Sequence, residues 1–289
     1  MNLLAYDFMQ RALIAALLTG LTAPAIGTYI VQRRLALLGD GIGHVALTGV
    51  AVGLLTGWAP VWTAVVVATI GAVVIELVRE RGRASGDVAL AMLFYGGIAG
   101  GVLITGLAGS TAATLNSYLF GSITTVSPSD LWVVAALAIG VLVLAIGLGP
   151  QLFAVCQDEV FARARGVPVR FYNLCIAVMA AVTVTVAMRT VGLLLVSALM
   201  VVPVATAQQL TSGFWSTFRW AMVLGVVPSL AGVVLSFYQP VAPGASIVVL
   251  ALAGFVLAWP VSVVVRRRRS RRTSDPPAAA SYVEGAAPP

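Results

Sequence analysis

The 289-residue sequence contains no lysine and a single histidine, His44, and only 9% of its residues are charged, against about 25% in soluble domains. A phosphate-binding loop of the G-x-x-x-x-G-K-[ST] type and a Schiff-base enzyme both require lysine, so the chain uses neither chemistry. One histidine excludes H-E-x-x-H and any multi-histidine metal site within one chain. Any ATP hydrolysis therefore belongs to a separate subunit, and we expect a protein that is not an enzyme.

Cysteine is also scarce. Cys156 and Cys175 are the two cysteines, and they form no C-x-x-C pair. They flank a segment that we place on the cytoplasmic side, where thiols stay reduced. We therefore expect two reduced, structural thiols.

Apolar residues are abundant, at 60% of the chain, and roughly 45–50% is usual in soluble domains. Because a membrane-crossing helix needs about 20 apolar residues, this composition predicts an all-α polytopic membrane protein with about nine transmembrane helices. The expected spans are 11–31, 37–57, 60–78, 88–107, 131–149, 172–189, 192–210, 219–238 and 245–265. A count of eight would require one weak run, the first or the sixth, to be re-entrant.

Arginine supplies all 17 basic side chains, and its distribution indicates the orientation. With the N-terminus outside, every arginine except Arg11 and Arg189 falls inside, as the positive-inside rule favours. The C-terminus is then cytoplasmic. We expect a transmembrane domain at 1–265 and an Arg-rich disordered tail at 266–289, which contacts anionic lipid and not nucleic acid.

Two ionisable residues, Asp40 and His44, lie within the second expected span. Four residues apart, they share one helix face, and such groups inside a membrane usually face a cavity or a partner. They suit three roles: a packed structural pair, a transient site for Zn²⁺ or Mn²⁺, or a proton relay. A two-fold dimer would supply four metal ligands, and the small residues Gly39 and Gly43 would leave room for the ion.

Two further segments are candidates for gating. The outer connection between 108 and 130 contains Leu119, Phe120 and Gly121 and is too apolar for a simple loop, so it predicts a short helix at the outer mouth. This helix either gates the path or only packs on the bundle. Pro203 should kink the seventh span, as a gate or as a packing bend.

A short helix is predicted outside the membrane at about 157–166. Asp158 and Glu159 occupy its first turn, arginines its last, and Gly166 is a good stop signal. With Val160 and Phe161 exposed, it would dock in a groove of a partner protein or lie on lipid and the bundle.

In three stretches, the sequence resembles the permease subunits of ABC importers for zinc, manganese and related divalent metals. They are 33–44, containing R-R-L-A-L-L-G-D and His44; 118–130, beginning Y-L-F-G; and 158–166 with 191–196 and 203–207 following. The resemblance covers most of 11–265. The sequence departs from it at Gly41 and Gly43, where many relatives carry larger residues, and in its Arg-rich tail.

The resemblance implies a homodimeric pore in a prokaryotic cytoplasmic membrane, two cytoplasmic ABC ATPase subunits that bind ATP, and an extracytoplasmic metal-binding protein. It implies that Asp40 and His44 are metal ligands, and that Asp158, Glu159, Ala162 and Gly166 belong to a coupling helix. We expect import of a divalent transition metal, zinc first and Mn²⁺ or Fe²⁺ next, with no permanently bound cofactor. The alternative is an ion-coupled secondary transporter in which Asp40 and His44 relay protons.

Overall fold

The computed structural model describes residues 6–80, 86–109, 117–122, 127–188, 191–193 and 195–273. Within these ranges the regular elements are helices, which confirms the all-α fold class. They are α1 (Asp7–Gln32), α2 (Leu38–Thr56), α3 (Pro60–Glu80), α4 (Gly86–Ala108), α6 (Pro128–Gly147), α7 (Gly149–Gln157), α8 (Glu159–Ala164), α9 (Val169–Ala187), α10 (Val196–Leu210), α11 (Phe214–Tyr238) and α12 (Pro243–Thr273).

In the described part of the chain, eight helices are long and apolar enough to cross a membrane. They correspond to the expected spans except the seventh, because α10 has only 15 residues. At about 1.5 Å per residue it is about 22 Å long, against a hydrocarbon core of about 30 Å. The expectation that the first or sixth run would be the incomplete one is wrong: α1 and α9 are both candidate spans. The apolar run alone did not reveal that α10 begins only at Val196.

The helix α1 lies in the middle of the bundle and contacts α6, α9, α10 and α11. Small residues make these contacts close: a side chain at Gly20 would meet the backbone of α11, and one at Gly27 would meet the backbone of Met200 in α10. Without a hydrophobic driving force between helices in lipid, such close approach is a main source of packing energy.

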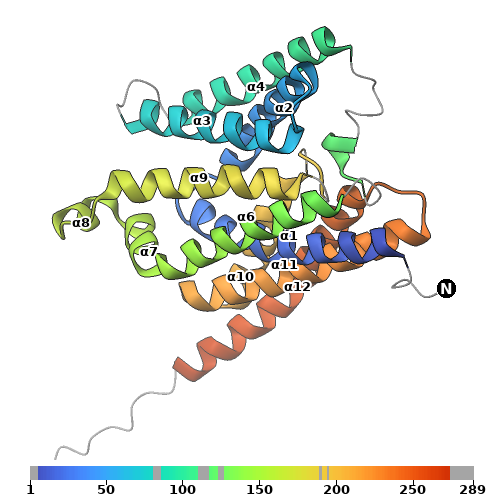
Figure 1. Cartoon of the computed structure of the whole chain (residues 1–289). Coiled ribbons are helices and arrows are strands. Elements are labelled where there is room, and N and C mark those ends of the chain that lie inside the picture. Colours follow the sequence, from blue (N-terminus) through green and yellow to red (C-terminus); the bar gives the residue numbers. More distant parts are fainter. Residues whose placement is uncertain are drawn as a thin grey trace, which may run out of the picture.

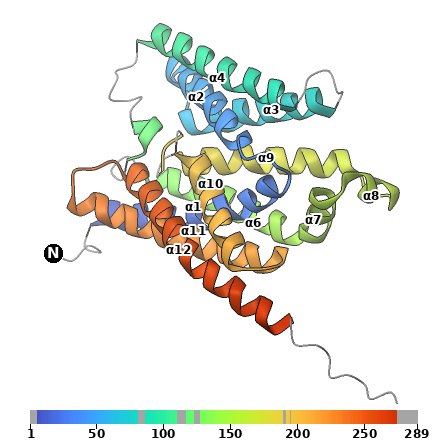
Figure 2. The same ribbon diagram turned by 180° about the vertical axis from the view of Figure 1, so that it is seen from behind.

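The helices α2, α3 and α4 form a separate layer beside α9, seen above it in Figure 1 and from behind in Figure 2. Glycines bring these three helices close together: Gly49 abuts α3, and Gly97 and Gly101 of α4 abut α2. A Cβ added at Gly96 of α4, by contrast, would have no atom of another element within 4 Å. One face of α4 is thus left unpacked.

The bundle has two distinct ends. The N-terminal end of α1 lies at one of them, and α7, α8 and the C-terminal end of α12 lie toward the other (Figure 1). The helix α12 continues to Thr273, so residues 266–273 are helical and not disordered as expected, while the boundary of the membrane domain at 265 stays a prediction. This segment contains no proline and is mostly arginine, a good helix former. The rest of the expected tail, 274–289, lies outside the described residues.

Candidate metal site and coupling helix

Asp40 and His44 lie in the first two turns of α2, as the sequence predicts. His44 is buried, and its ring packs edge-on against Phe94 of α4 with the ring centroids 4.3 Å apart. Asp40 is half-buried and lines a cavity of about 370 Å³ with Phe94 and Tyr95. The carboxylate therefore faces an open space between α2 and α4.

Ser197 in the first turn of α10 is a neighbour of Asp40 that the sequence did not indicate. Its hydroxyl donates to Asp40 Oδ1 at 3.5 Å. Because α10 starts at Val196, the N-terminus of α10 lies beside the Asp40 carboxylate. A helix that begins inside the bundle is tolerated where its irregular backbone is buried in protein.

Met200 of α10 lies between α1 and the start of α2. Gly27 of α1 packs on the Met200 backbone, and a side chain at Gly39 would lie 3.2 Å from Met200 Sδ. Asp40, next to Gly39, therefore lies close to the place where α10 packs on α1.

Gly39 and Gly43 do not leave room for an ion, which corrects the sequence-based expectation. A Cβ at Gly43 would lie 3.0 Å from the carbonyl oxygen of Leu193. Both glycines are instead close contacts that seat α2 against α10 and the segment before it. Gly41, on another face of α2, packs near Leu93 of α4.

The segment that contains Leu119, Phe120 and Gly121 contacts the backbone just before α10. Residues 117–120 form a helical turn, and Gly192 packs directly against the backbone of 119–121. The Leu193 amide donates to the carbonyl of Tyr118 at 2.9 Å. Because Leu193 also contacts Gly43, one residue joins the outer turn to the helix that carries His44.

Among the described residues, no three His, Cys, Asp or Glu side chains gather in a group that could hold a metal ion. Asp40, which lines the cavity, and His44, one turn further along α2, are the two candidate ligands. That a second copy completes a set of four ligands stays a prediction.

The predicted helix outside the membrane is α8, which is shorter than expected. The Asp158 carboxylate accepts hydrogen bonds from the amides of Val160 and Phe161 and caps it. Ala162 is buried, and Gly166 adopts φ of 79°, so these residues shape the helix. The side chains of Val160 and Phe161 are 79% and 54% exposed and provide its free apolar face.

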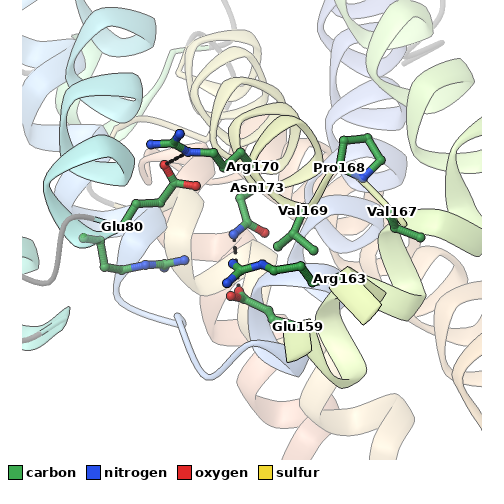
Figure 3. Close-up of a pocket in the computed structure, with 9 residues that line it drawn as sticks. Glu80, Glu159, Arg163, Val167, Pro168, Val169, Arg170 and Asn173 are labelled. Carbon is green, nitrogen blue, oxygen red and sulfur yellow. Dashed lines mark hydrogen bonds and ion pairs between the residues drawn. The ribbon is translucent and has the colours of Figure 1, made fainter. Parts of the chain in front are cut away.

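Charged side chains gather where α3, α8 and α9 meet, around a cavity of about 660 Å³ (Figure 3). Glu159 accepts a hydrogen bond from Asn173 of α9 at 3.3 Å, and Arg170 pairs with Glu80 at 2.8 Å. Glu76 pairs with Arg79 at 2.9 Å and is buried.

Both cysteines are free: Cys156 is buried in α7 and Cys175 half-buried in α9.

Pro203 lies inside α10 and borders a cavity of about 200 Å³ between α10, α11 and α12. Its role as a gate or a bend stays a prediction.

The ABC 3 transport family matches residues 5–262. The chain belongs to this family. A manganese transport system membrane protein, MntC, of Halalkalibacterium halodurans is 37% identical over 89% of this chain and 88% of its own length. The manganese import system permease protein ScaB of Streptococcus parasanguinis is 30% identical over 88% of this chain and 91% of its own.

A solved structure gives the same result for the fold. The chain superposes on PsaBC from Streptococcus pneumoniae, determined in complex with a Fab, with a TM-score of 0.81 and 29% identity over 89% of this chain and 93% of that one. This ABC 3 family chain is therefore a multi-pass permease of the metal ABC importer type. The ion-coupled secondary transporter belongs to a different class, and the family membership decides against it.

Proposed function

We propose that this permease forms, as a homodimer, the path by which an ATP-driven importer brings Mn²⁺ across the cytoplasmic membrane. The position of Asp40 on an open cavity, with His44 one turn further along the same helix, carries the proposal. An extracytoplasmic metal-binding protein delivers the ion, and separate ABC ATPase subunits bind and hydrolyse ATP.

Manganese takes the place of zinc as the first substrate. Carboxylate and imidazole are ligands for both metals, so Asp40 and His44 alone do not separate them. The relatives from Halalkalibacterium and Streptococcus parasanguinis are named for manganese, and carboxylate oxygen suits Mn²⁺ well. Zn²⁺ and Fe²⁺ are the competitors to test.

The second copy would pack on α4. This helix contacts α2 and α3, and its other face exposes Met92, Tyr95 and Leu103 at 65%, 69% and 67%. Gly96 lies on the same face with nothing packed against it. Because the cavity of Asp40 is lined by α4 residues, a copy seated there would close it and place its own ligands nearby.

The ATPase would dock on α8. Its exposed apolar pair, Val160 and Phe161, is the kind of face that a groove on a partner accepts. The end of the bundle with α8 is then cytoplasmic, and the arginine distribution supports this orientation. The C-terminus is on the same side.

Cellular metal content tests the function. A host without its own importers is complemented with the whole transporter carrying native permease, the Asp40→Ala/His44→Ala double variant, or Asp7→Ala as a matched control at the exposed start of α1. At equal membrane abundance, mass spectrometry should find Mn²⁺ raised by native and Asp7→Ala chains and at background with the double variant. No accumulation with the native chain refutes the importer, and normal uptake by the double variant refutes the site.

The dimer face has its own test. Gly96→Trp should convert the purified permease from dimer to monomer, because the indole would occupy the proposed contact. Gly140→Trp is the matched control, since Gly140 of α6 also has nothing within 4 Å. Dimers in both variants would place the interface elsewhere.

A further inference from the structure

Arg33 links the ATPase-docking helix to the helix that carries the candidate metal ligands. One guanidinium nitrogen of Arg33 lies 2.6 Å from Glu159 Oε1 in α8. The same nitrogen lies 3.8 Å from Glu76 Oε1 in α3. A single side chain thus contacts two elements that are distant in sequence from α1.

Arg33 and one of its two partners are removed from solvent. The side chain of Arg33 is 6% exposed and that of Glu76 is 2% exposed, whereas Glu159 is 42% exposed. Buried charges depend strongly on the geometry of their partners, because an unpaired charge in such a place is costly. A displacement of Glu159 would therefore pull on Arg33 more strongly than a surface ion pair would.

The connection from Arg33 to Asp40 is short and hydrogen-bonded. Arg33 is the C-cap of α1, and the amide of Leu35 donates to the carbonyl of Ile30. The amide of Leu38 then donates to Leu35 and starts α2, with Asp40 in its first turn. Leu38 itself is buried. A movement at Arg33 is transmitted through this turn to the end of α2 that bears Asp40.

We infer that Arg33 is a positioning residue that couples displacement of α8 to the metal-ligand end of α2. The inference rests on the proposed function and deepens it, since it names the side-chain connection between ATP hydrolysis and the metal site. Glu159 is the member of the connection on α8. Glu76, on α3, is the fixed point against which Arg33 is held.

A second ion pair, at the cavity that Glu159 also lines, supplies a matched control. Arg170 pairs with Glu80 at 2.8 Å, but the Arg170 side chain is 70% exposed and the pair joins α9 to α3 without involving α8 (Figure 3). Both pairs contain one arginine and one glutamate on the α8 side of the bundle. They differ in burial and in the contact with α8.

The experiment uses the complete transporter in proteoliposomes, with Mn²⁺ uptake and ATP hydrolysis measured on the same sample. For Arg33→Gln we expect the number of Mn²⁺ ions transported per ATP to fall at least tenfold while ATP hydrolysis stays within about threefold of native. Arg33→Lys should restore part of the ratio, and Arg170→Gln should leave it unchanged. Mn²⁺ binding to the detergent-solubilised permease should be unchanged in all variants.

A double-mutant cycle separates coupling from general stability. Glu159→Gln should lower the ratio as Arg33→Gln does, and the double variant should be no worse than either single one, because both remove the same connection. An unchanged ratio in Arg33→Gln overturns the inference, as does an equal loss in Arg170→Gln. If Arg33→Gln does not assemble, Glu159→Gln tests the same connection from the other side of the pair, and an unchanged ratio there overturns the inference equally.

Uptake by the native transporter distinguishes failure of the role of Arg33 from failure of the proposed function. Native uptake with a normal ratio in Arg33→Gln refutes the role of Arg33 and leaves the proposed function intact. Absence of native uptake refutes the proposed function and this inference with it.

Discussion

The hydroxyl of Ser197 donates to the carboxylate of Asp40 although the two residues are 157 positions apart in the sequence. The contact joins the first turn of α10 to the first turn of α2, next to the cavity between α2 and α4. The hydrogen bond thus positions a candidate metal ligand through α10, a contact that the sequence did not predict.

Removal of this hydroxyl should weaken metal capture. Hydrogen bonds to charged groups contribute about 1.5–3 kcal/mol, and at 3.5 Å this one should lie at or below the lower end. We expect Ser197→Ala to raise the KM for Mn²⁺ uptake about three- to tenfold in proteoliposomes that contain the ATPase. Ser236→Ala is the control, because the Ser236 hydroxyl donates to the backbone of Val241, away from the site. Equal KM values for both variants would contradict a role in holding Asp40.

Gly39 and Gly43 of α2 should differ in their tolerance of a methyl group. Alanine at Gly43 places Cβ 3.0 Å from the Leu193 carbonyl oxygen, which belongs to the backbone, whereas alanine at Gly39 meets the flexible Met200 side chain at 3.2 Å. Overpacking costs typically 1–3 kcal/mol. We expect Gly43→Ala to lower the apparent Tm in detergent more than Gly39→Ala does.

The control for this comparison is Gly140→Ala, which meets nothing within 4 Å and should leave the Tm unchanged. If Gly39→Ala and Gly43→Ala lower the Tm equally, the rigid backbone at Leu193 does not make Gly43 less tolerant of a methyl group than Gly39.

The sequence predicted most of the membrane helices because apolar length is a local property that hydropathy reports directly. Asp40, His44 and the short helix at about 157–166 were also predicted, since each depends on residues a few positions apart. The start of α10 could not be predicted, because the segment before it is apolar and reads as part of the same membrane span. Only the contacts of Leu193 with Tyr118 and with Gly43 show that the chain is irregular there.

The charged connection between Arg33 and Glu159 was missed for a similar reason. Arg33 was interpreted as a topology signal and Glu159 as a first-turn acid, and each interpretation is adequate locally. Their pairing joins residues 126 positions apart, and no periodicity reports such a contact. The role foreseen for Gly39 and Gly43 was wrong because residue size indicates room but not which neighbour fills it.

The cap of α8 should be needed for productive docking of the ATPase. The Asp158 carboxylate accepts hydrogen bonds from Val160 and Phe161 at 2.9 and 3.0 Å, and loss of an N-cap costs about 0.5–2 kcal/mol. A helix of six residues has few internal hydrogen bonds, so its cap is a large part of its local stability. We expect Asp158→Ala to lower Mn²⁺-stimulated ATP hydrolysis several-fold and to speed amide exchange at 160 and 161. Asp158→Ser retains a hydrogen-bond acceptor and should restore both ATP hydrolysis and slow amide exchange. If serine restores neither, the carboxylate has a role other than capping α8.

The thiol of Cys156 in α7 should be unreactive at neutral pH. Burial raises its pKa from 9.0 to about 12, the Glu159 charge adds to this effect, and Arg33 opposes it. Because the thiolate is the reactive form, a Cys175→Ser protein should react with iodoacetamide at pH 8 at least a hundredfold more slowly when folded than in denaturant. The folded state favours the neutral thiol, so its contribution to stability is complete below pH 9 and decreases as the pH rises toward 12. Rapid labelling of folded protein at pH 8 would mean that α7 opens readily and that Cys156 is not held in the packed interior beside Tyr29.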